Sequence, residues 1–118
     1  MKIRNGFVSN SSSSSFIIKE EDTERYKQFV NNLIDFVKNN KLCNYYDEPI
    51  DIDNLKEELE PFEYSKLDLI TQEIIDKKIK DLKPNDVYVS IDDHCVPEYI
   101  AQMIDKSFHI ERIEWRYW

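Results

Sequence analysis

Glycine is nearly absent from this sequence of 118 residues, in which Gly6 is the single example. Phosphate-binding loops of the Walker and dinucleotide-binding types need several glycines, because their backbone must turn sharply and approach the phosphates closely. Both types of nucleotide site are therefore excluded. No apolar run exceeds three residues, so we expect no segment that spans a membrane. A serine run follows Lys2 and Arg4 where a secretion signal needs an apolar core, so we also expect no signal peptide.

Cysteine is scarce as well. Cys43 and Cys95 are too few and too far apart for the disulfide framework of a secreted protein, so we expect reduced thiols and a cytoplasmic protein. Neither thiol has the spacing to a second ligand that is typical of a metal site. The pair Asp51 and Asp53 lacks the central glycine and the distal glutamate of a calcium loop. The sequence therefore predicts no metal and no cofactor.

Positive charge is the third shortage, because 24 acids oppose 16 lysines and arginines and leave a net charge of −8. Phosphate backbones repel such a chain, which disfavours direct nucleic-acid binding. Between residues 47 and 63, eight acids accompany one lysine, so this segment alone carries −7. The segment is either a solvated surface or an acidic patch that complements a basic partner or mimics nucleic-acid phosphates. The candidate partner-binding acids are Asp51, Asp53, Glu57 and Glu58.

Apolar residues are sufficient for a folded core, at 41% of the chain with 13% aromatic residues. The length corresponds to about one domain. No internal repeat or linker divides the chain. We therefore expect a single domain over residues 1–118, in which a serine-rich N-terminal segment, 1–20, precedes a body at 21–118.

Hydrophobic periodicity predicts alternating strands and helices. The helix at 22–40 is the clearest, because its apolar residues follow the i, i+3, i+4, i+7 rule. Ser65 and Asp68 resemble a capping box, which predicts a helix from 65 to about 82. Short strands are expected at 16–19 and 42–46, and a short helix is expected at 53–60. The residues expected to point inward are Tyr26, Phe29, Val30, Leu33, Ile34 and Val37 in the first helix and Leu67, Ile70, Ile74, Ile75 and Ile79 in the helix after Ser65.

The last third of the chain predicts a strand, a helix and a second strand. Residues 87–91 are rich in β-branched and aromatic side chains, and Pro97 is well placed to begin a helix that extends to about Lys106. Residues 108–118 predict a long strand with a bulge near Glu111 and Arg112, where the alternation changes phase. Such an order fits a βαβ unit with two parallel neighbouring strands. The residues expected to point inward from this helix are Val96, Ile100, Met103 and Ile104.

The expected fold class is therefore α/β, with α+β as the alternative. We expect a small sheet of three to five strands, packed by two or three helices and ending in a βαβ-like unit.

The serine run, with Ser11, Ser12, Ser13, Ser14 and Ser15, favours no regular structure, because hydroxyl groups compete for nearby backbone hydrogen bonds. One interpretation is a flexible loop. The apolar flanks at Phe7–Val8 and 16–18 favour a second interpretation, a loop tethered at both ends. Such a loop could bind an anion or accept phosphate, which adds about −1.5 to −2 charges per site.

Residues 2–18, Lys-Ile-Arg-Asn-Gly-Phe-Val-Ser-Asn-Ser-Ser-Ser-Ser-Ser-Phe-Ile-Ile, closely resemble an N-terminal signature of small uncharacterised proteins from tailed phages and their host bacteria. The match covers about the first 18 residues, and the chain from Lys19 onward resembles no family. The resemblance implies an origin in a phage or another mobile element and a location in the bacterial host cell. It supplies no activity and no catalytic residues.

A second group that could carry chemistry follows the strand at 87–91. Asp92, Asp93, His94 and Cys95 lie between the end of this strand and the start of a helix, where open α/β sheets collect ligand sites. His94 could act as a general base, and Cys95 near a helix N-terminus could have a lowered pKa. The simpler interpretation is a turn with a capping acid.

The chain closes with Trp115, Arg116, Tyr117 and Trp118. On a strand, the first and third of these residues share one face, and Arg116 and Trp118 share the other. Tryptophan and arginine are enriched at binding hot spots. The sequence therefore adds Trp115, Arg116 and Trp118 to the candidate partner-binding residues.

The leading hypothesis is a small acidic phage protein that binds and modulates a host protein without catalysis, for example as an anti-defence inhibitor. The expected partner has a basic surface. A ligand- or nucleotide-binding domain that uses the serine run or the Asp92–Cys95 turn is one alternative. A structural or virion-associated component is the other. The oligomeric state stays open.

Overall fold

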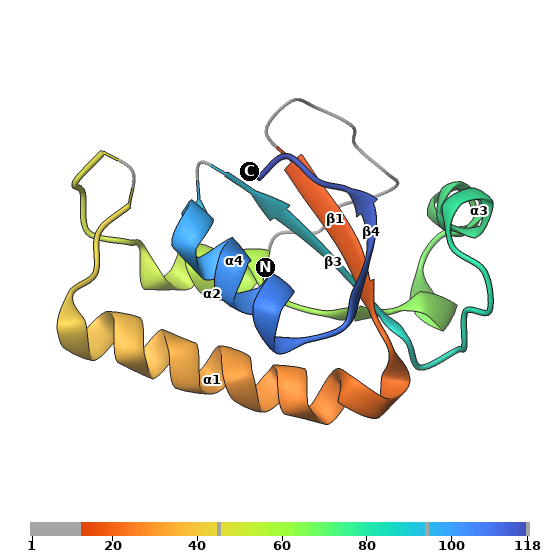
Figure 1. Ribbon diagram of the computed structural model, residues 1–118, viewed down its shortest axis with the longest axis horizontal. Coiled ribbons are helices and arrows are strands. Elements are labelled where there is room, and N and C mark those ends of the chain that lie inside the picture. Colours follow the sequence, from red (N-terminus) through yellow and green to blue (C-terminus); the bar gives the residue numbers. More distant parts are fainter. Residues whose placement is uncertain (1–12, 45, 94, 118) are drawn as a thin grey trace.

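The computed structural model describes residues 13–44, 46–93 and 95–117. Within these residues, four strands form one antiparallel sheet in the order β2-β3-β1-β4 (Figure 1). The predicted small α/β architecture is confirmed. The strands are β1 (Ser13–Ile18), β2 (Phe62–Glu63), β3 (Val87–Asp92) and β4 (Ile110–Glu114), and the helices are α1 (Thr23–Asn40), α2 (Ile52–Glu58), α3 (Leu69–Lys78) and α4 (Glu98–Ser107).

Half of β1 consists of serines, and β1 lies in the middle of the sheet. Ser13 pairs with Asp92 of β3, and Ser15 pairs with Ser90 of β3 on one side and with Glu114 of β4 on the other. Ser13, Ser14 and Ser15 are 3%, 0% and 2% exposed. The expectation of a loop is therefore wrong for these three residues. Pairing with two neighbouring strands supplies the backbone hydrogen bonds that serine side chains would otherwise compete for.

The C-terminal strand–helix–strand unit is split by β1. Both β3 and β4 are antiparallel to β1, so they are parallel to each other, but β1 lies between them. The expectation that these two strands are neighbours is wrong. A local pattern predicts the crossover helix, but it cannot predict that a strand distant in sequence is inserted into the gap.

The larger core lies between one face of the sheet and the helices α1, α2 and α4 (Figure 1). Phe16 and Ile18 of β1 alternate with Ile17, so they point into this core together with Val87 and Val89 of β3. The predicted apolar stripe of α1 is confirmed, since its residues are buried or packed against the same core. From α1, the Tyr26 hydroxyl donates a hydrogen bond of 2.8 Å to the carbonyl of Leu59 at the end of α2.

A smaller core lies on the opposite face, where Ile75 and Ile79 cover Ile17, Tyr88 and Ile113. The helix that supplies this cover, α3, begins later than predicted. The side chain of Asp68 caps it by accepting a hydrogen bond of 2.7 Å from the N–H of Thr71, so Ser65 is not its cap.

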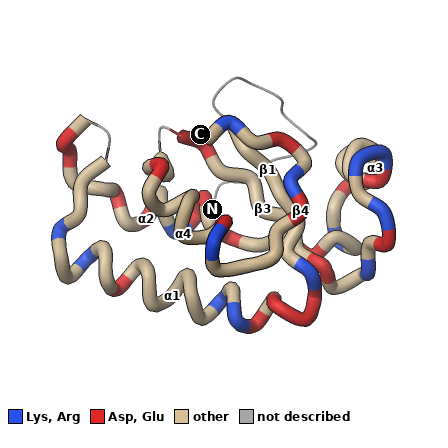
Figure 2. Tube along the Cα trace, in the orientation of Figure 1, with Lys and Arg blue, Asp and Glu red and all other residues tan. Residues whose placement is uncertain are grey.

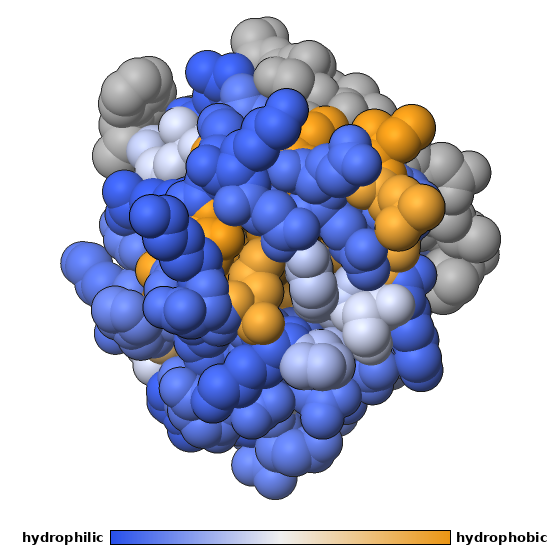
Figure 3. Space-filling view, turned by 90° about the vertical axis from the view of Figure 1, so that its right-hand side faces the viewer, coloured by the Kyte–Doolittle hydropathy of each residue, from blue (hydrophilic) through white to orange (hydrophobic). Residues whose placement is uncertain are grey.

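Ile70 lies at the N-terminal end of α3 and is 68% exposed, as is its neighbour Leu69 at 75%. The expectation that Ile70 points inward is therefore wrong. Figure 3 shows this side of the molecule, where hydrophobic side chains reach the surface among hydrophilic ones. From α3 it is Ile75 that joins the smaller core, whereas Leu69 and Ile70 at the start of the helix do not belong to it.

The predicted bulge in β4 is present one residue beyond the expected place. Phe16 pairs with Arg112 and Ser15 pairs with Glu114, so Ile113 is the extra residue. The strand ends at Glu114, earlier than expected.

Three other details differ from the sequence-based expectations. Met103 of α4 is 40% exposed, although it was expected to point inward. The short strand β2 was not predicted. Among the described residues from 42 to 46, an isolated bridge from Cys43 to Pro49 is present in place of the expected strand. The pair Asn5–Gly6, which is a strong turn signal in the sequence, lies outside the described residues.

Candidate functional site

Two of the four candidate partner-binding acids have structural roles. The Asp51 carboxylate caps α2 by accepting hydrogen bonds from the N–H groups of Asp53 and Asn54, at 3.0 and 3.2 Å. Glu58 is buried at 3% exposure, and its Oε1 accepts a bond of 2.9 Å from the N–H of Asp92. Because β2 pairs only with the first two residues of β3, the Glu58 carboxylate supplies an acceptor that this sheet edge lacks.

The other two candidate acids, Asp53 and Glu57, line a surface groove between α1 and α2 with a volume of ≈ 720 Å³. Glu60 and Pro61 extend its α2 side, and Lys27 from α1 lies on the opposite wall. Val30 and Asn31 of α1 complete that wall, and Lys56 lines the groove as a second basic residue. The groove therefore presents three carboxylates beside two lysines.

A second groove, of ≈ 520 Å³, lies at the start of α1 and shares Lys27 with the first. Its acids come from two parts of the chain, since Glu63 belongs to β2 and the others precede or begin α1. We call the acids of the two grooves the acidic band. Its members are Glu20, Glu21, Glu24, Asp53, Glu57, Glu60 and Glu63.

The acidic band keeps its negative charge despite neighbouring lysines. Glu20, Glu24 and Glu63 form ion pairs of 3.5–3.6 Å with Lys83, Lys27 and Lys66, respectively. These pairs are exposed, and such pairs contribute only about 0–1 kcal/mol each. Seven acids against Lys27, Lys56, Lys66 and Lys83 leave a formal charge of −3. Figure 2 shows acidic residues in red where the chain enters α1.

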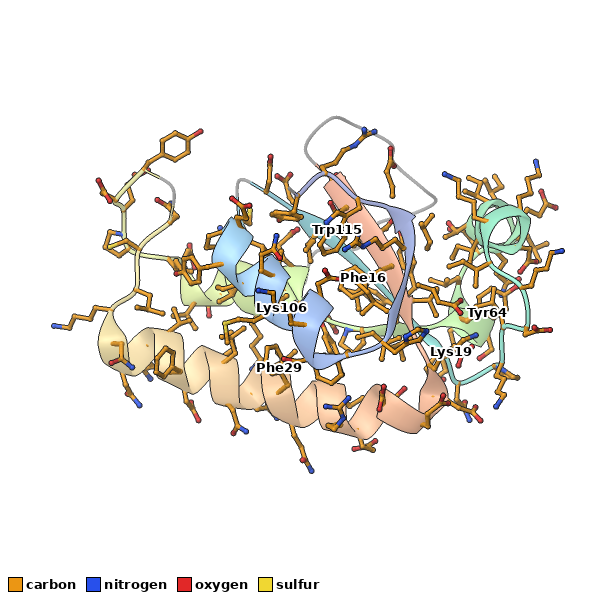
Figure 4. The ribbon with its side chains drawn as sticks, viewed as in Figure 1. Phe16, Lys19, Phe29, Tyr64, Lys106 and Trp115 are labelled. Carbon is orange, nitrogen blue, oxygen red and sulfur yellow. The ribbon has the colours of Figure 1, made fainter. Side chains whose placement is uncertain are left out.

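Two residues of the aromatic terminus are held by the sheet. The Trp115 ring packs edge-on against Phe16 (Figure 4), at 6.1 Å between centroids. The Arg112 guanidinium lies 4.5 Å from the same indole centroid. Arg116 donates its backbone N–H to Ser14 and pairs its side chain with Glu114. Trp115 therefore contributes mainly to packing, whereas the Arg116 side chain is exposed. Trp118 lies outside the described residues.

The serine run is divided by the limit of the described residues. Ser11 and Ser12 lie outside them, and Ser13, Ser14 and Ser15 are buried in β1. The Ser14 hydroxyl is used internally, since it accepts the Arg116 N–H at 2.7 Å. An anion or a modifying enzyme would have to reach these three hydroxyls through a packed sheet.

The Asp92–Cys95 turn is built as a structural junction. The Asp92 carbonyl accepts hydrogen bonds from the N–H groups of Cys95 and Val96, at 3.0 and 2.8 Å. The Tyr117 hydroxyl then donates a bond of 2.8 Å to the Val96 carbonyl. Burial, followed by the nearby Asp93, Asp92 and Glu58 carboxylates and Cys95, raises the pKa of Tyr117. His94 lies outside the described residues.

Within the described residues, no group of three or more His, Cys, Asp and Glu side chains is arranged to hold a metal ion. None of the helices found there is both long enough and apolar enough to cross a membrane. Comparisons with protein-family models, curated proteins and solved structures found no match to this chain.

The structure adds acids that the sequence-based prediction missed. Glu20, Glu21 and Glu24 are near one another in the sequence, where four acids occupy five positions from 20 to 24. That local density is a signal, but their closeness to Glu63 is tertiary. Asp86 creates it, because its carboxylate accepts bonds from the Glu20 N–H at 2.8 Å and its carbonyl accepts the Tyr64 N–H at 2.8 Å.

Proposed function

We propose that this chain is a binding protein without catalytic activity, which attaches through the acidic band to a basic surface on a host protein and so modulates that protein. The observation that carries the proposal is the convergence of seven carboxylates on two adjoining grooves: six come from η1 (Glu20–Asp22), α1, α2 and β2, and Glu60 lies between α2 and β2. Acidic surfaces of this kind steer basic partners toward them and increase association rates.

Several further observations support binding in preference to catalysis. In the Asp92–Cys95 turn, the Asp92 carbonyl accepts two internal hydrogen bonds, and three of the five serines are buried. The resemblance of residues 2–18 to a phage signature supports a host protein as the partner. An anti-defence inhibitor is the example that we favour.

The test compares two variants of equal charge. The first variant neutralises four acids of the band, Glu21→Gln, Glu24→Gln, Asp53→Asn and Glu60→Gln. The control neutralises four exposed acids outside it, Asp35→Asn, Asp47→Asn, Glu48→Gln and Glu73→Gln. Asp51 and Glu58 stay unchanged in both, because their carboxylates stabilise the fold.

Each protein is used as bait in lysate of the bacterial host, and the captured protein is then titrated in purified form. We expect one partner with a basic surface, whose affinity for the band variant falls about tenfold or more, since four lost interactions of about 0.5 kcal/mol each sum to that loss. The control variant should bind as the wild type does. Equal binding of the two variants, or no stable complex with the wild type, would contradict the proposal.

A further inference from the structure

A third groove, of ≈ 590 Å³, runs along the exposed face of α4 and shares no residue with the acidic band. Tyr99 and Met103, which both line it, are 42% and 40% exposed. The Tyr99 hydroxyl is fixed by a hydrogen bond of 3.1 Å to the Cys43 carbonyl, which holds the 41–50 loop beside the helix. The residues that line the groove are Asn44, Pro97, Glu98, Tyr99, Gln102, Met103 and Lys106.

The residues of α4 that line the groove form two stripes along the helix. Glu98, Gln102 and Lys106 follow the spacing i, i+4, i+8, and Tyr99 and Met103 follow i, i+4 beside them. The opposite face of the helix is buried in the larger core. The exposed face therefore has an apolar stripe next to a stripe with an acid at one end, a base at the other and an amide at the centre.

This arrangement is complementary to itself. At a rise of 1.5 Å per residue, Glu98 and Lys106 lie about 6 Å on either side of Gln102 along the helix axis. If a second copy of α4 lies antiparallel across the groove, with a twofold axis at Gln102, each Glu98 faces the Lys106 of the other copy. The same axis places the Tyr99 and Met103 stripes against each other, because it keeps each stripe on its own side.

Charge also favours a second copy of this chain as the occupant of the groove. The chain carries −8, so most of its surface repels a second copy. The α4 groove has one acid and one base among its lining residues and is formally neutral. Figure 4 shows Lys106 on α4, at the end of the helix that leads toward β4. Aromatic residues and methionine are also enriched at interface cores.

We propose that two copies of this chain form a homodimer through the exposed faces of α4, which pack antiparallel with reciprocal Glu98–Lys106 ion pairs around a Tyr99–Met103 contact. This dimer is independent of the acidic band, which stays available to a partner on each copy.

The first test measures the monomer–dimer equilibrium by sedimentation over a range of protein concentrations. Each single reversal, Glu98→Lys or Lys106→Glu, converts two attractive pairs into two repulsive ones. It should raise the dimer dissociation constant about tenfold or more. The double reversal, Glu98→Lys with Lys106→Glu, restores both pairs and should restore dimerisation. Met103→Lys should abolish dimerisation, whereas Leu69→Lys, at an exposed apolar residue of α3, should leave it intact.

The second test examines the register by oxidative crosslinking in a Cys43→Ser background. Gln102→Cys lies at the proposed axis and should crosslink two copies. Ser107→Cys should not crosslink. Residue 107 lies five positions from the twofold axis, so its two copies are about 15 Å apart along the helix direction, beyond the reach of a disulfide. The melting temperature of every variant is measured, since Glu98 lies in the first turn of α4, where an acid favours the helix.

Three results would overturn the dimer. These are a monomer at every concentration, a double reversal that associates no better than the single ones, and equal crosslinking at positions 102 and 107. A monomer whose purified host partner loses affinity on Met103→Lys would instead assign the groove to that partner.

Discussion

The buried hydroxyl of Ser14 accepts a hydrogen bond of 2.7 Å from the backbone N–H of Arg116, which lies 102 residues further along the chain. This bond joins the serine run to the C-terminal segment beyond the end of β4. It gives the Ser14 hydroxyl a partner inside the fold, although serine is ordinarily found in turns and loops. The serine next to it, Ser15, is also buried, but its hydroxyl makes no hydrogen bond within the described part of the chain.

Ser14→Ala and Ser15→Ala should therefore differ in their effect on stability. We expect Ser14→Ala to lower the free energy of unfolding by about 1–3 kcal/mol, since it leaves the N–H of Arg116 without its acceptor. Ser15→Ala removes a buried polar group with no partner and should be neutral or stabilising. Urea denaturation of the two variants measures both values. A larger loss for Ser15→Ala would contradict the assignment.

Replacement of Glu58 should separate its role in the fold from its charge. Glu58→Gln keeps an acceptor for the Asp92 N–H, so we expect it to retain most of the stability. Glu58→Leu leaves that buried N–H unsatisfied and should cost about 1–3 kcal/mol. The neutral control Glu60→Gln should change the free energy of unfolding by less than about 0.5 kcal/mol, as surface changes usually do. Equal stability of the Leu and Gln variants would show that Glu58 is not needed as an acceptor.

Two isoleucines of α3 should respond very differently to truncation. Ile75 is fully buried against the sheet, and Ile75→Ala should lower the free energy of unfolding by about 2–5 kcal/mol. Ile70 is 68% exposed, and Ile70→Ala should change it by less than about 0.5 kcal/mol. Thermal or urea denaturation distinguishes the two outcomes. Similar losses would mean that α3 is rotated relative to the arrangement described above.

The pair of Tyr64 and Asp76 should add a pH-dependent contribution to stability in the alkaline range. The Tyr64 hydroxyl donates a bond of 2.5 Å to Asp76 Oδ1. This bond, with burial and the Asp76 charge, raises the pKa of Tyr64 from 10.0 to about 12. Because the folded-state pKa is the higher one, the contribution is complete below pH 10.0 and is lost as the pH rises toward about 12.

The measurement is a spectrophotometric titration combined with urea denaturation at several alkaline pH values. Asp76→Asn should return the pKa of Tyr64 toward 10.0. Tyr64→Phe should lose stability less steeply than the wild type between these two pKa values. Tyr26 and Tyr117, whose pKa values are also raised, are present in both proteins, so their contributions cancel in the comparison. An unchanged slope in Tyr64→Phe would contradict the assignment.

Local patterns predicted the helices and strands whose apolar residues repeat with a regular period. The helix at 23–40, the strand at 87–92 and the helix after Pro97 were all predicted within a few residues. They were predictable because each shows its period within its own segment. Ile70 and Met103 fit the same helical spacing and are nonetheless exposed, since a period cannot show where the opposing surface ends.

The candidate binding surface was predictable only in part. The acidity of residues 47–63 is visible in the sequence, but the Asp51 carboxylate caps α2 and the Glu58 carboxylate is buried against β3. Their roles depend on a helix N-terminus and on a strand edge, and only the folded chain brings those groups within hydrogen-bond distance. The acids at 20–24 become part of the acidic band only in the folded chain, where the Asp86 carboxylate accepts a hydrogen bond from the Glu20 N–H.

The sequence by itself determined the acidic net charge and excluded glycine-rich nucleotide-binding loops, because composition and charge depend on no contact between distant residues. It also determined most of the elements, since hydrophobic periodicity is local. The tertiary structure alone decided the place of the serine run. Strand pairing is a long-range choice, and burial between β3 and β4 outweighed the preference of serine for loops. It also decided which acids face solvent and which face of α4 is left uncovered, because both depend on packing between segments far apart in the chain.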